Sequence, residues 1–180
     1  MNKYAHLVGG FTFGLLFSNI VLEKVATMTG SEMPIIAVTA IVVVSSIGAC
    51  LIPDIDHRSS SISKKHPIIS KVVRVFAGHR ELTHAPLLYI ILGSLLLGLT
   101  SQVPLALHEI YTYVVIGCFI GILSHLTLDA MTKSGIHILY PFSKMRFNIL
   151  RLQTGKFICD GLAMIVMLLV SFFSIMSIPI

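Results

Sequence analysis

Three short clusters of ionisable residues interrupt a chain that is otherwise mostly apolar. Each cluster lies at an end of a long hydrophobic run. Ionisable side chains beside hydrocarbon are costly, so they indicate function. Imidazoles and carboxylates that converge on one point are typical of a metal site. The clusters contain Asp54, Asp56 and His57; His79, Arg80, Glu81 and His84; and His125 and Asp129.

Two of the clusters have a spacing that suits metal binding. His125 and Asp129 lie four residues apart, about 6 Å along a helix axis, so both can reach one ion. Asp54 and Asp56 follow Pro53, which ends a preceding helix and lets both carboxylates turn toward a common point. His57 would either bind the metal ion or orient another ligand. The alternatives are a His–Asp hydrogen bond between helices and an acidic turn in solvent.

The middle cluster is less regular. His79 and His84 lie five residues apart, so they reach one site only if the chain bends where it enters the next hydrophobic run. Arg80 is a candidate ligand for a phosphate, because guanidinium groups bind oxyanions in a fork, and Glu81 is a candidate acid or base. The alternatives are an exposed loop histidine for His79 and a helix-start hydrogen bond for His84.

The composition predicts an integral membrane protein. Apolar residues make up 55% of the chain and charged residues 12%, and several runs approach the roughly 18 residues that cross a bilayer as a helix. We therefore expect an all-α membrane protein, one domain over residues 1–180, built as a polytopic bundle of about five transmembrane helices. The expected spans are 7–22, 34–52, 86–103, 110–131 and 161–180.

The basic residues predict the orientation. Six Lys and Arg lie between the second and third runs and five between the fourth and fifth, whereas 104–109 has none. Because basic loops stay in the cytoplasm, the N-terminus is predicted to be cytoplasmic, with Lys24 as the exception. All three clusters then lie on the cytoplasmic side, where His6 begins the first run. Membrane lipids explain the net charge of +5 better than nucleic acid does.

Two stripes of small residues predict how the helices pack. Residues four apart share a helix face, and small residues let membrane helices approach closely. In both stripes the small residues continue into candidate ligands; the alternative is that glycine is merely frequent in membrane helices. The stripes are His6, Gly10, Gly14 and Ser18, and Gly117, Gly121, His125 and Asp129.

Two connecting segments have their own patterns. After Ser59, Ile69, Val72, Val73 and Phe76 recur at helical spacing, which predicts a cytoplasmic-side interfacial helix, with an ordinary surface helix as the alternative. Residues 136–152 are compatible with a short hairpin or with a re-entrant loop.

Taken together, the three motifs make the chain similar to the YdjM-type family, described as LexA-regulated, inner-membrane-bound, metal-dependent hydrolases. The matching segments are 48–57 with Ser60, 79–84 and 124–132, continued by Gly135 and 140–142; Ala85 departs from the serine that is common in the family. The family is remotely similar to zinc-dependent phospholipase C and P1-type nucleases. The resemblance implies metal-dependent phosphoester hydrolysis, with a phospholipid or lipid phosphate as a candidate substrate.

These observations lead to one hypothesis and two alternatives. The hypothesis is a cytoplasm-facing hydrolase that binds one or two divalent ions, zinc first and manganese or iron next. The alternatives are a non-enzymatic metal-binding or metal-transporting protein, and a structural network without metal. The candidate ligands are His6, Asp54, Asp56, His57, His79, His84, His125 and Asp129; the candidate catalytic residues are Asp56, Arg80 and Glu81; the candidate substrate-binding residues are Arg80 and Arg151.

Overall fold

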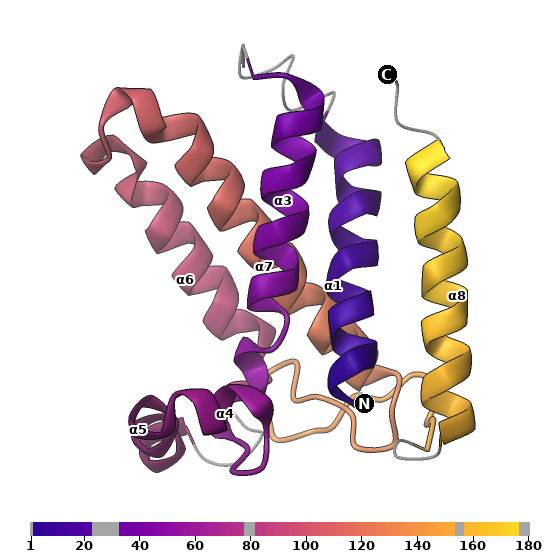
Figure 1. Cartoon of the computed structure of the whole chain (residues 1–180). Coiled ribbons are helices and arrows are strands. Elements are labelled where there is room, and N and C mark those ends of the chain that lie inside the picture. The colour runs from indigo at the N-terminus through magenta and orange to yellow at the C-terminus, as the bar shows by residue number, and fades with distance from the viewer. Residues whose placement is uncertain (1, 23–32, 78–81, 154–156, 177–180) are drawn as a thin grey trace.

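The chain is described by a computed structural model that covers residues 2–22, 33–77, 82–153 and 157–176 (Figure 1). This part of the chain forms seven α-helices and no β-sheet. The prediction of an all-α fold is confirmed. The helices are α1 (Lys3–Phe17), α3 (Ile35–Ala49), α4 (Ser61–Lys65), α5 (Pro67–Ala77), α6 (Pro86–Gly98), α7 (His108–Ala130) and α8 (Phe157–Met176).

Four helical segments are long and apolar enough to cross a membrane. They are Lys3–Val21, Ile35–Asp56, Leu105–Ala130 and Cys159–Met176, and they match four of the predicted runs within a few residues. The remaining run forms the helical segment Pro86–Gln102, which is shorter than 18 residues. Residues 23–32, including Lys24, lie outside the described part of the chain.

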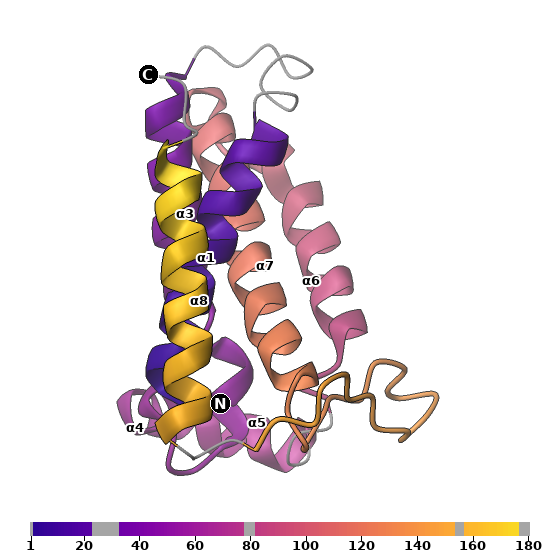
Figure 2. The same cartoon turned by 90° about the vertical axis from the view of Figure 1, so that its right-hand side faces the viewer.

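The bundle is organised around α3. This helix packs against both α1 and α7, while α8 packs on α1 and α6 packs on α7 (Figures 1 and 2). The ends of α1, α3, α6 and α7 that carry the predicted ligands lie together at the lower end of Figure 1. For the described members of the three polar clusters, the prediction that they share one end of the bundle is therefore confirmed.

Glycines allow α3 to lie this close to its two neighbours. A Cβ at Gly10 of α1 would lie 3.0 Å from the Cβ of Cys50, and one at Gly117 of α7 would lie 2.7 Å from the Val42 carbonyl oxygen. At Gly121 a Cβ would overlap the Ser46 carbonyl group, whose carbon would be 2.8 Å away. Both predicted stripes therefore face α3, as close helix packing through small residues requires.

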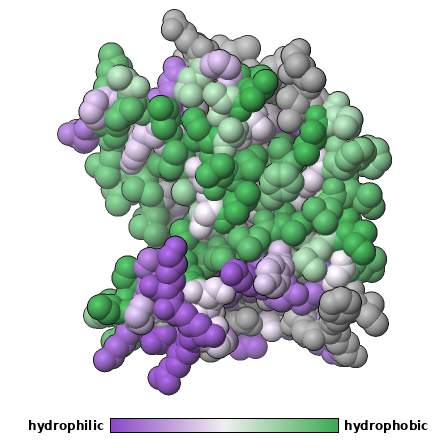
Figure 3. All heavy atoms as spheres, in the orientation of Figure 1, coloured by the Kyte–Doolittle hydropathy of each residue, from purple (hydrophilic) through white to green (hydrophobic). Residues whose placement is uncertain are grey.

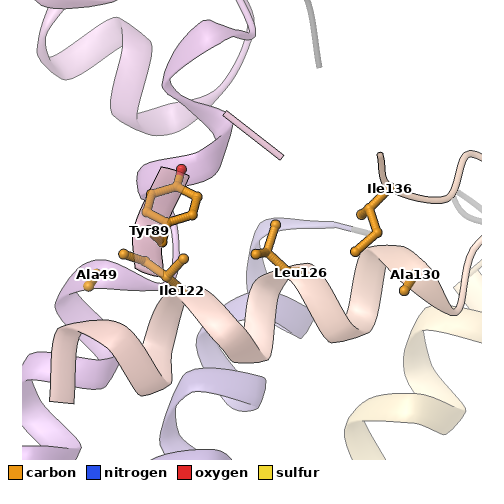
Figure 4. Packing of buried hydrophobic residues seen from close by; sticks show 6 residues of the cluster. All are labelled: Ala49, Tyr89, Ile122, Leu126, Ala130 and Ile136. Carbon is orange, nitrogen blue, oxygen red and sulfur yellow. The ribbon is translucent and has the colours of Figure 1, made fainter. Parts of the chain in front are cut away.

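A cluster of buried hydrophobic side chains closes the bundle near the site. It joins α3, α6 and α7 to the loop that follows α7 (Figure 4). Burial of a large aliphatic side chain such as Ile136 contributes about 1.5–3 kcal/mol, so this residue holds the loop against the end of α7. The cluster consists of Ala49, Tyr89, Ile122, Leu126, Ala130 and Ile136.

The loop after α7 is hairpin-like. The Ile136 amide donates to the Phe147 carbonyl at 3.0 Å, and the Phe147 amide donates back at 2.8 Å. The Leu152 amide donates to the Met131 carbonyl at 3.0 Å, which returns the chain to the end of α7. The antiparallel bridge between Ile136 and Phe147 agrees with the hairpin form. Whether the segment enters the membrane stays a prediction.

Helix α5 carries the predicted amphipathic pattern. Its exposed apolar side chains are Ile68, Ile69, Val72, Val75 and Phe76. Val73 is half-buried, so the exposed stripe is shifted toward Val75 relative to the prediction. In Figure 3 hydrophobic residues cover the middle and upper parts of the visible face, and hydrophilic residues gather at the lower end, where α4 and α5 lie.

The glycine contact predicts a large effect of one methyl group. Gly121→Ala should lower the free energy of unfolding by about 2 kcal/mol or more, because the added Cβ meets backbone that cannot move aside. Gly48→Ala is the matched control, since nothing lies within 4 Å of its Cβ position, and it should be neutral or stabilising by up to about 1 kcal/mol. Thermal unfolding followed by circular dichroism in detergent measures both. Equal melting temperatures would contradict the packing.

Candidate metal centre

Five candidate ligands converge at the lower end of the bundle. His6 comes from the first turns of α1, Asp54 from the 3-10 turn η2 (Ile52–Asp56), His84 from the residues before α6, and His125 and Asp129 from the last turns of α7. The Nε2 atom of His84 lies 3.5 Å from Asp129 Oδ2 and 3.9 Å from Asp54 Oδ1. The Nε2 atom of His125 lies 3.7 Å and 3.8 Å from the same two atoms.

The spacing of these atoms suits a metal ion. Two sets, His6 with Asp54 and His125, and His84 with His125 and Asp129, each have ligand atoms within 4.8 Å of one another. Zinc bonds of about 2.0–2.2 Å separate tetrahedral ligands by roughly 3.4 Å, so small shifts would close either set on an ion. Asp129 Oδ1 lies 3.5 Å from His6 Nε2, whereas Oδ2 faces His84 and His125. The carboxylate of Asp129 therefore lies between the two sets.

The donors are buried on one side and accessible on the other. His6, His84, His125 and Asp129 expose at most 2% of their surface, whereas the Asp54 side chain exposes 21%. Asp54 also lines a polar cleft of about 300 Å³ at the lower end of the bundle. A catalytic metal needs one open coordination position, and Asp54 marks the side on which it would lie.

A backbone contact orients His125. Its Nδ1 lies 2.7 Å from the Cys50 carbonyl oxygen, which can only accept, so Nδ1 carries the proton in the neutral ring. The lone pair of Nε2 then points toward the carboxylates of Asp54 and Asp129. Metal-binding histidines are commonly held in this way by a carbonyl on the far nitrogen. The His6 ring stacks on His125, with centroids 3.8 Å apart.

His84 is held by a second pair of contacts. Its Nδ1 lies 3.1 Å from the Thr83 hydroxyl, and the Tyr89 hydroxyl donates to the Thr83 carbonyl at 2.7 Å. Tyr89 lies in α6 and belongs to the buried cluster of Figure 4. The hydrophobic packing of α6 therefore positions the segment that carries His84.

Buried nitrogen atoms favour a metal over a purely structural network. Within the described part of the chain, Nε2 of His84 and Nε2 of His125 are buried and have no hydrogen-bond partner. Their distances to the carboxylates exceed the usual hydrogen-bond length of about 2.7–3.2 Å. Buried polar atoms are nearly always satisfied, and a cation between the imidazoles and the carboxylates would satisfy these two nitrogens.

Serine side chains hold the turn that presents Asp54. Pro53 follows the end of α3 within η2, as expected of a residue that cannot continue the helix. The Ser60 hydroxyl donates to the Asp54 carbonyl, and the hydroxyls of Ser63 and Ser70 donate to the Ile55 carbonyl, each at 2.7 Å. The turn is thus tied to both α4 and α5 through its backbone.

Other predicted site residues lie elsewhere. Asp56 is buried in η2 but belongs to neither of the two ligand sets, and His57 contacts the Ser59 hydroxyl through Nδ1 at 2.9 Å. Arg151 is exposed and donates through Nε to Asn148 Oδ1 at 3.3 Å. Their proposed roles remain predictions. His79, Arg80 and Glu81 lie outside the described residues.

Sequence reasoning missed the groups that orient the histidines. Thr83 stands next to His84 in the middle motif, but the motif alone does not reveal that its hydroxyl contacts the His84 ring. Tyr89 sits one turn into an apolar run, where a buried tyrosine needs a hydrogen-bond partner, and that requirement was the available signal. The Cys50 carbonyl is a backbone group, so no side-chain pattern reveals its role.

Comparison with known proteins agrees with the motifs. The family model of the YdjM inner membrane protein matches residues 1–178. The chain belongs to the YdjM inner membrane protein family. The predicted family is thereby confirmed, and the structure adds to this membrane protein a buried His and Asp cluster that could hold a metal ion.

Two relatives of this YdjM-family chain come from distant bacteria. YvsG of Bacillus subtilis is 40% identical over 113 residues, which cover 62% of this chain and 64% of the relative. Inner membrane protein YdjM of Escherichia coli is 35% identical over 127 residues, covering 67% of this chain and 62% of the relative. The chain therefore spans somewhat less than two thirds of these relatives. No solved structure matches it.

The contacts of Tyr89 predict an effect on metal affinity. Tyr89→Phe removes the hydroxyl that holds the Thr83 carbonyl, so it should weaken binding of the retained divalent ion by about tenfold, measured by competition with a chelator. Tyr111→Phe is the matched control, because its hydroxyl donates to the Leu96 carbonyl at 2.7 Å, toward the opposite ends of α6 and α7. Equal affinities in the two variants would exclude a role of Tyr89 in the centre.

Proposed function

We propose that the protein is a membrane-embedded, metal-dependent hydrolase that cleaves a phosphoester at the cytoplasmic face. One observation carries the proposal: three buried donors, His84, His125 and Asp129, stand beside Asp54, which is partly exposed and lines a polar cleft. Buried donors on one side and an accessible side are what a catalytic metal requires. A purely structural site would be closed.

The donor set suits zinc. Three imidazoles and two carboxylates supply mixed nitrogen and oxygen ligands, which zinc accepts and which also suit manganese or iron. When bound, such an ion supplies an activated water and stabilises charge on a phosphoryl oxygen. One or two ions fit the proposal, since the two oxygens of Asp129 reach toward different imidazoles.

The remaining roles fall to residues around the donors. Asp54 would orient the attacking water, because its carboxylate is the donor nearest to the open cleft. Asp56 and Glu81 are the proposed acid or base groups, and Arg80 and Arg151 the proposed phosphate ligands. Removing a positioned acid or base typically slows a reaction by about 10²–10⁴-fold.

The same proposal includes an arrangement in the membrane. Five spans, with Pro86–Gln102 as the fifth, would place the N-terminus and the metal centre on the cytoplasmic side, in agreement with the distribution of basic residues. The exposed apolar side chains of α5 support its placement in the membrane interface. Lipids are the proposed partners, and a phospholipid or lipid phosphate the proposed substrate.

A non-enzymatic metal-binding or metal-transporting protein is the second candidate. The observation in its favour is the burial of the donors, of which four expose at most 2% of their surface. Transporters usually bind their ions near the middle of the membrane on interrupted helices. Here the donors lie at one end of the bundle, which favours the hydrolase.

The proposal is tested with purified protein. Wild type should retain divalent metal, measured by elemental mass spectrometry, and release phosphate or alcohol from phospholipid or generic phosphoester substrates. His125→Ala should lose most of the metal and at least about 10³-fold of the activity, because it removes a ligand and with it the metal-bound water. His66→Ala is the control, since His66 is exposed at the end of α4.

The outcomes separate the candidates. Absence of metal from folded wild type, purified without chelator, would overturn both the hydrolase and the metal-binding candidate. Stoichiometric metal without turnover on any phosphoester would favour binding or transport. Loss of activity in His125→Ala with full metal content would remove His125 from the ligand set.

Orientation has its own test. Ser61 and Ser101 are exposed. Ser61 begins α4, at the lower end of the bundle in Figure 1, and Ser101 lies in the 3-10 turn Leu99–Gln102 that follows α6, whose last turns lie toward the upper end. In intact cells a membrane-impermeant thiol reagent should label Ser101→Cys and spare Ser61→Cys, which should react only after the membrane is opened. The protein has three cysteines of its own, of which Cys50 is buried. Labelling of the protein without either substitution therefore gives the background. Labelling of Ser61→Cys from outside would reverse the topology.

A further inference from the structure

A second cleft lies beside the candidate metal centre. It has a volume of about 740 Å³ and lies between η2 with the residues that follow it and one side of α5. Three of its side chains are permanently cationic: Arg58 after the turn, and Lys71 and Arg74 on the helix. The remaining lining residues are Asp56, His57, Ser59 and Val75.

The charges of this cleft suit an anion. Among the described lining residues the one carboxylate is that of Asp56, which is 1% exposed, whereas Arg58 and Lys71 are exposed and Arg74 is half-buried. The accessible wall is therefore cationic. Guanidinium and ammonium groups bind phosphate oxygens through charge-assisted hydrogen bonds, which are about twice as strong as neutral ones.

Arg74 is held in place by the fold. Its Nη1 donates to the Ser70 hydroxyl, which in turn donates to the Ile55 carbonyl at 2.7 Å. The guanidinium is thus tied to the same turn that presents Asp54 to the metal centre. A cation fixed in this way loses little freedom when it binds an anion.

The apolar face of α5 places the cleft at a membrane surface. Ile68, Ile69, Val72 and Phe76 are exposed, and Val75, which is 72% exposed, also lines the cleft. A helix with these side chains on one face and Lys or Arg beside them lies at the boundary between acyl chains and headgroups. The cations of the cleft would then be at the level of lipid phosphates.

We propose that this cleft binds the phosphate headgroup of an anionic phospholipid. Arg58, Lys71 and Arg74 hold the phosphate oxygens, while Val75 and the apolar face of α5 contact the beginning of the acyl chains. The long aliphatic stems of Lys and Arg can lie along that apolar face while their charged ends reach the phosphate. An anionic lipid is favoured over a zwitterionic one because no second carboxylate is present among the described lining residues to hold a headgroup amine.

The position of the cleft connects it with the metal centre. A neighbouring polar cleft of about 300 Å³ shares His57 and Ser59 with it and reaches Asp54. A lipid held by Arg58 and Lys71 would therefore have its headgroup close to the accessible side of the centre. The identification of this lipid as the substrate rests on the proposed hydrolase function; its binding does not.

The test measures lipid binding to the full chain in detergent. Short-chain phosphatidylglycerol is titrated and its adducts are quantified by native mass spectrometry, with phosphatidylcholine of the same chain length for comparison. Arg58→Gln combined with Lys71→Gln should weaken phosphatidylglycerol binding by about tenfold or more, because two charge-assisted contacts are lost. Arg74 is left intact, since it also supports the turn at Ile55.

The matched control removes the same charge elsewhere. Lys64→Gln combined with Lys65→Gln changes two exposed lysines in the last turn of α4 that do not line the cleft, and it should bind phosphatidylglycerol like wild type. If both double variants weaken phosphatidylglycerol binding equally, the effect comes from net charge and not from this cleft, and the site is overturned. Equal binding of phosphatidylcholine, or displacement by equimolar inorganic phosphate, would overturn the assignment to an anionic lipid.

Metal content separates this proposal from the hydrolase proposal. Both double variants should keep the metal of the wild type, because none of the four residues belongs to the ligand sets. Selective lipid binding with no hydrolysis would leave the lipid site in place and contradict the hydrolase. If Arg58→Gln with Lys71→Gln changes neither hydrolysis nor lipid binding, the lipid site is contradicted. The hydrolase proposal is not affected by that result.

Discussion

The close contact of α3 with α1 and α7 is the interaction on which the candidate centre depends. Gly10 and Gly121 lie against the same stretch of α3, where the Ser46 hydroxyl donates to the Gly10 carbonyl at 2.7 Å. One turn toward the site, His6 and His125 stack on each other. A side chain at either glycine would push the helices apart and separate the rings, so backbone packing in the membrane region sets the distances between the ligands.

The centre also shows how a protein can place ionisable groups at the end of an apolar bundle. Its imidazoles are oriented by backbone and hydroxyl groups: Cys50 holds His125, and Thr83 with Tyr89 holds His84. These contacts leave the inner nitrogens directed at two carboxylates. Charge in a low-dielectric region is costly unless it is paired, and a divalent cation between carboxylates and neutral imidazoles pairs it without protons.

The polar turn η2 links the inside of the bundle to its surface. One side chain of the turn, Asp54, faces the candidate centre, while Asp56 lines the cationic cleft. Serines from α4 and α5 donate to its backbone carbonyls, so the amphipathic helix is tied to the turn that carries Asp54. This coupling gives the proposed lipid site and the proposed hydrolytic site a common support.

The sequence by itself determined the all-α class, the family, the packing stripes and the end of the bundle at which the ligands gather, because hydrophobic length and four-residue periodicity are local properties. It could not choose among the ligands. Asp54 and Asp56 both lie within three residues after Pro53. Asp54 faces the imidazoles of His84 and His125, whereas Asp56 belongs to neither ligand set, because the 3-10 turn directs the two carboxylates differently. The sequence already offered His6 as a candidate, but its stacking on His125 and its approach to Asp129 are tertiary contacts. The contacts that orient the far nitrogens of His84 and His125, and the cationic cleft, likewise join residues whose separation in sequence carries no signal of contact.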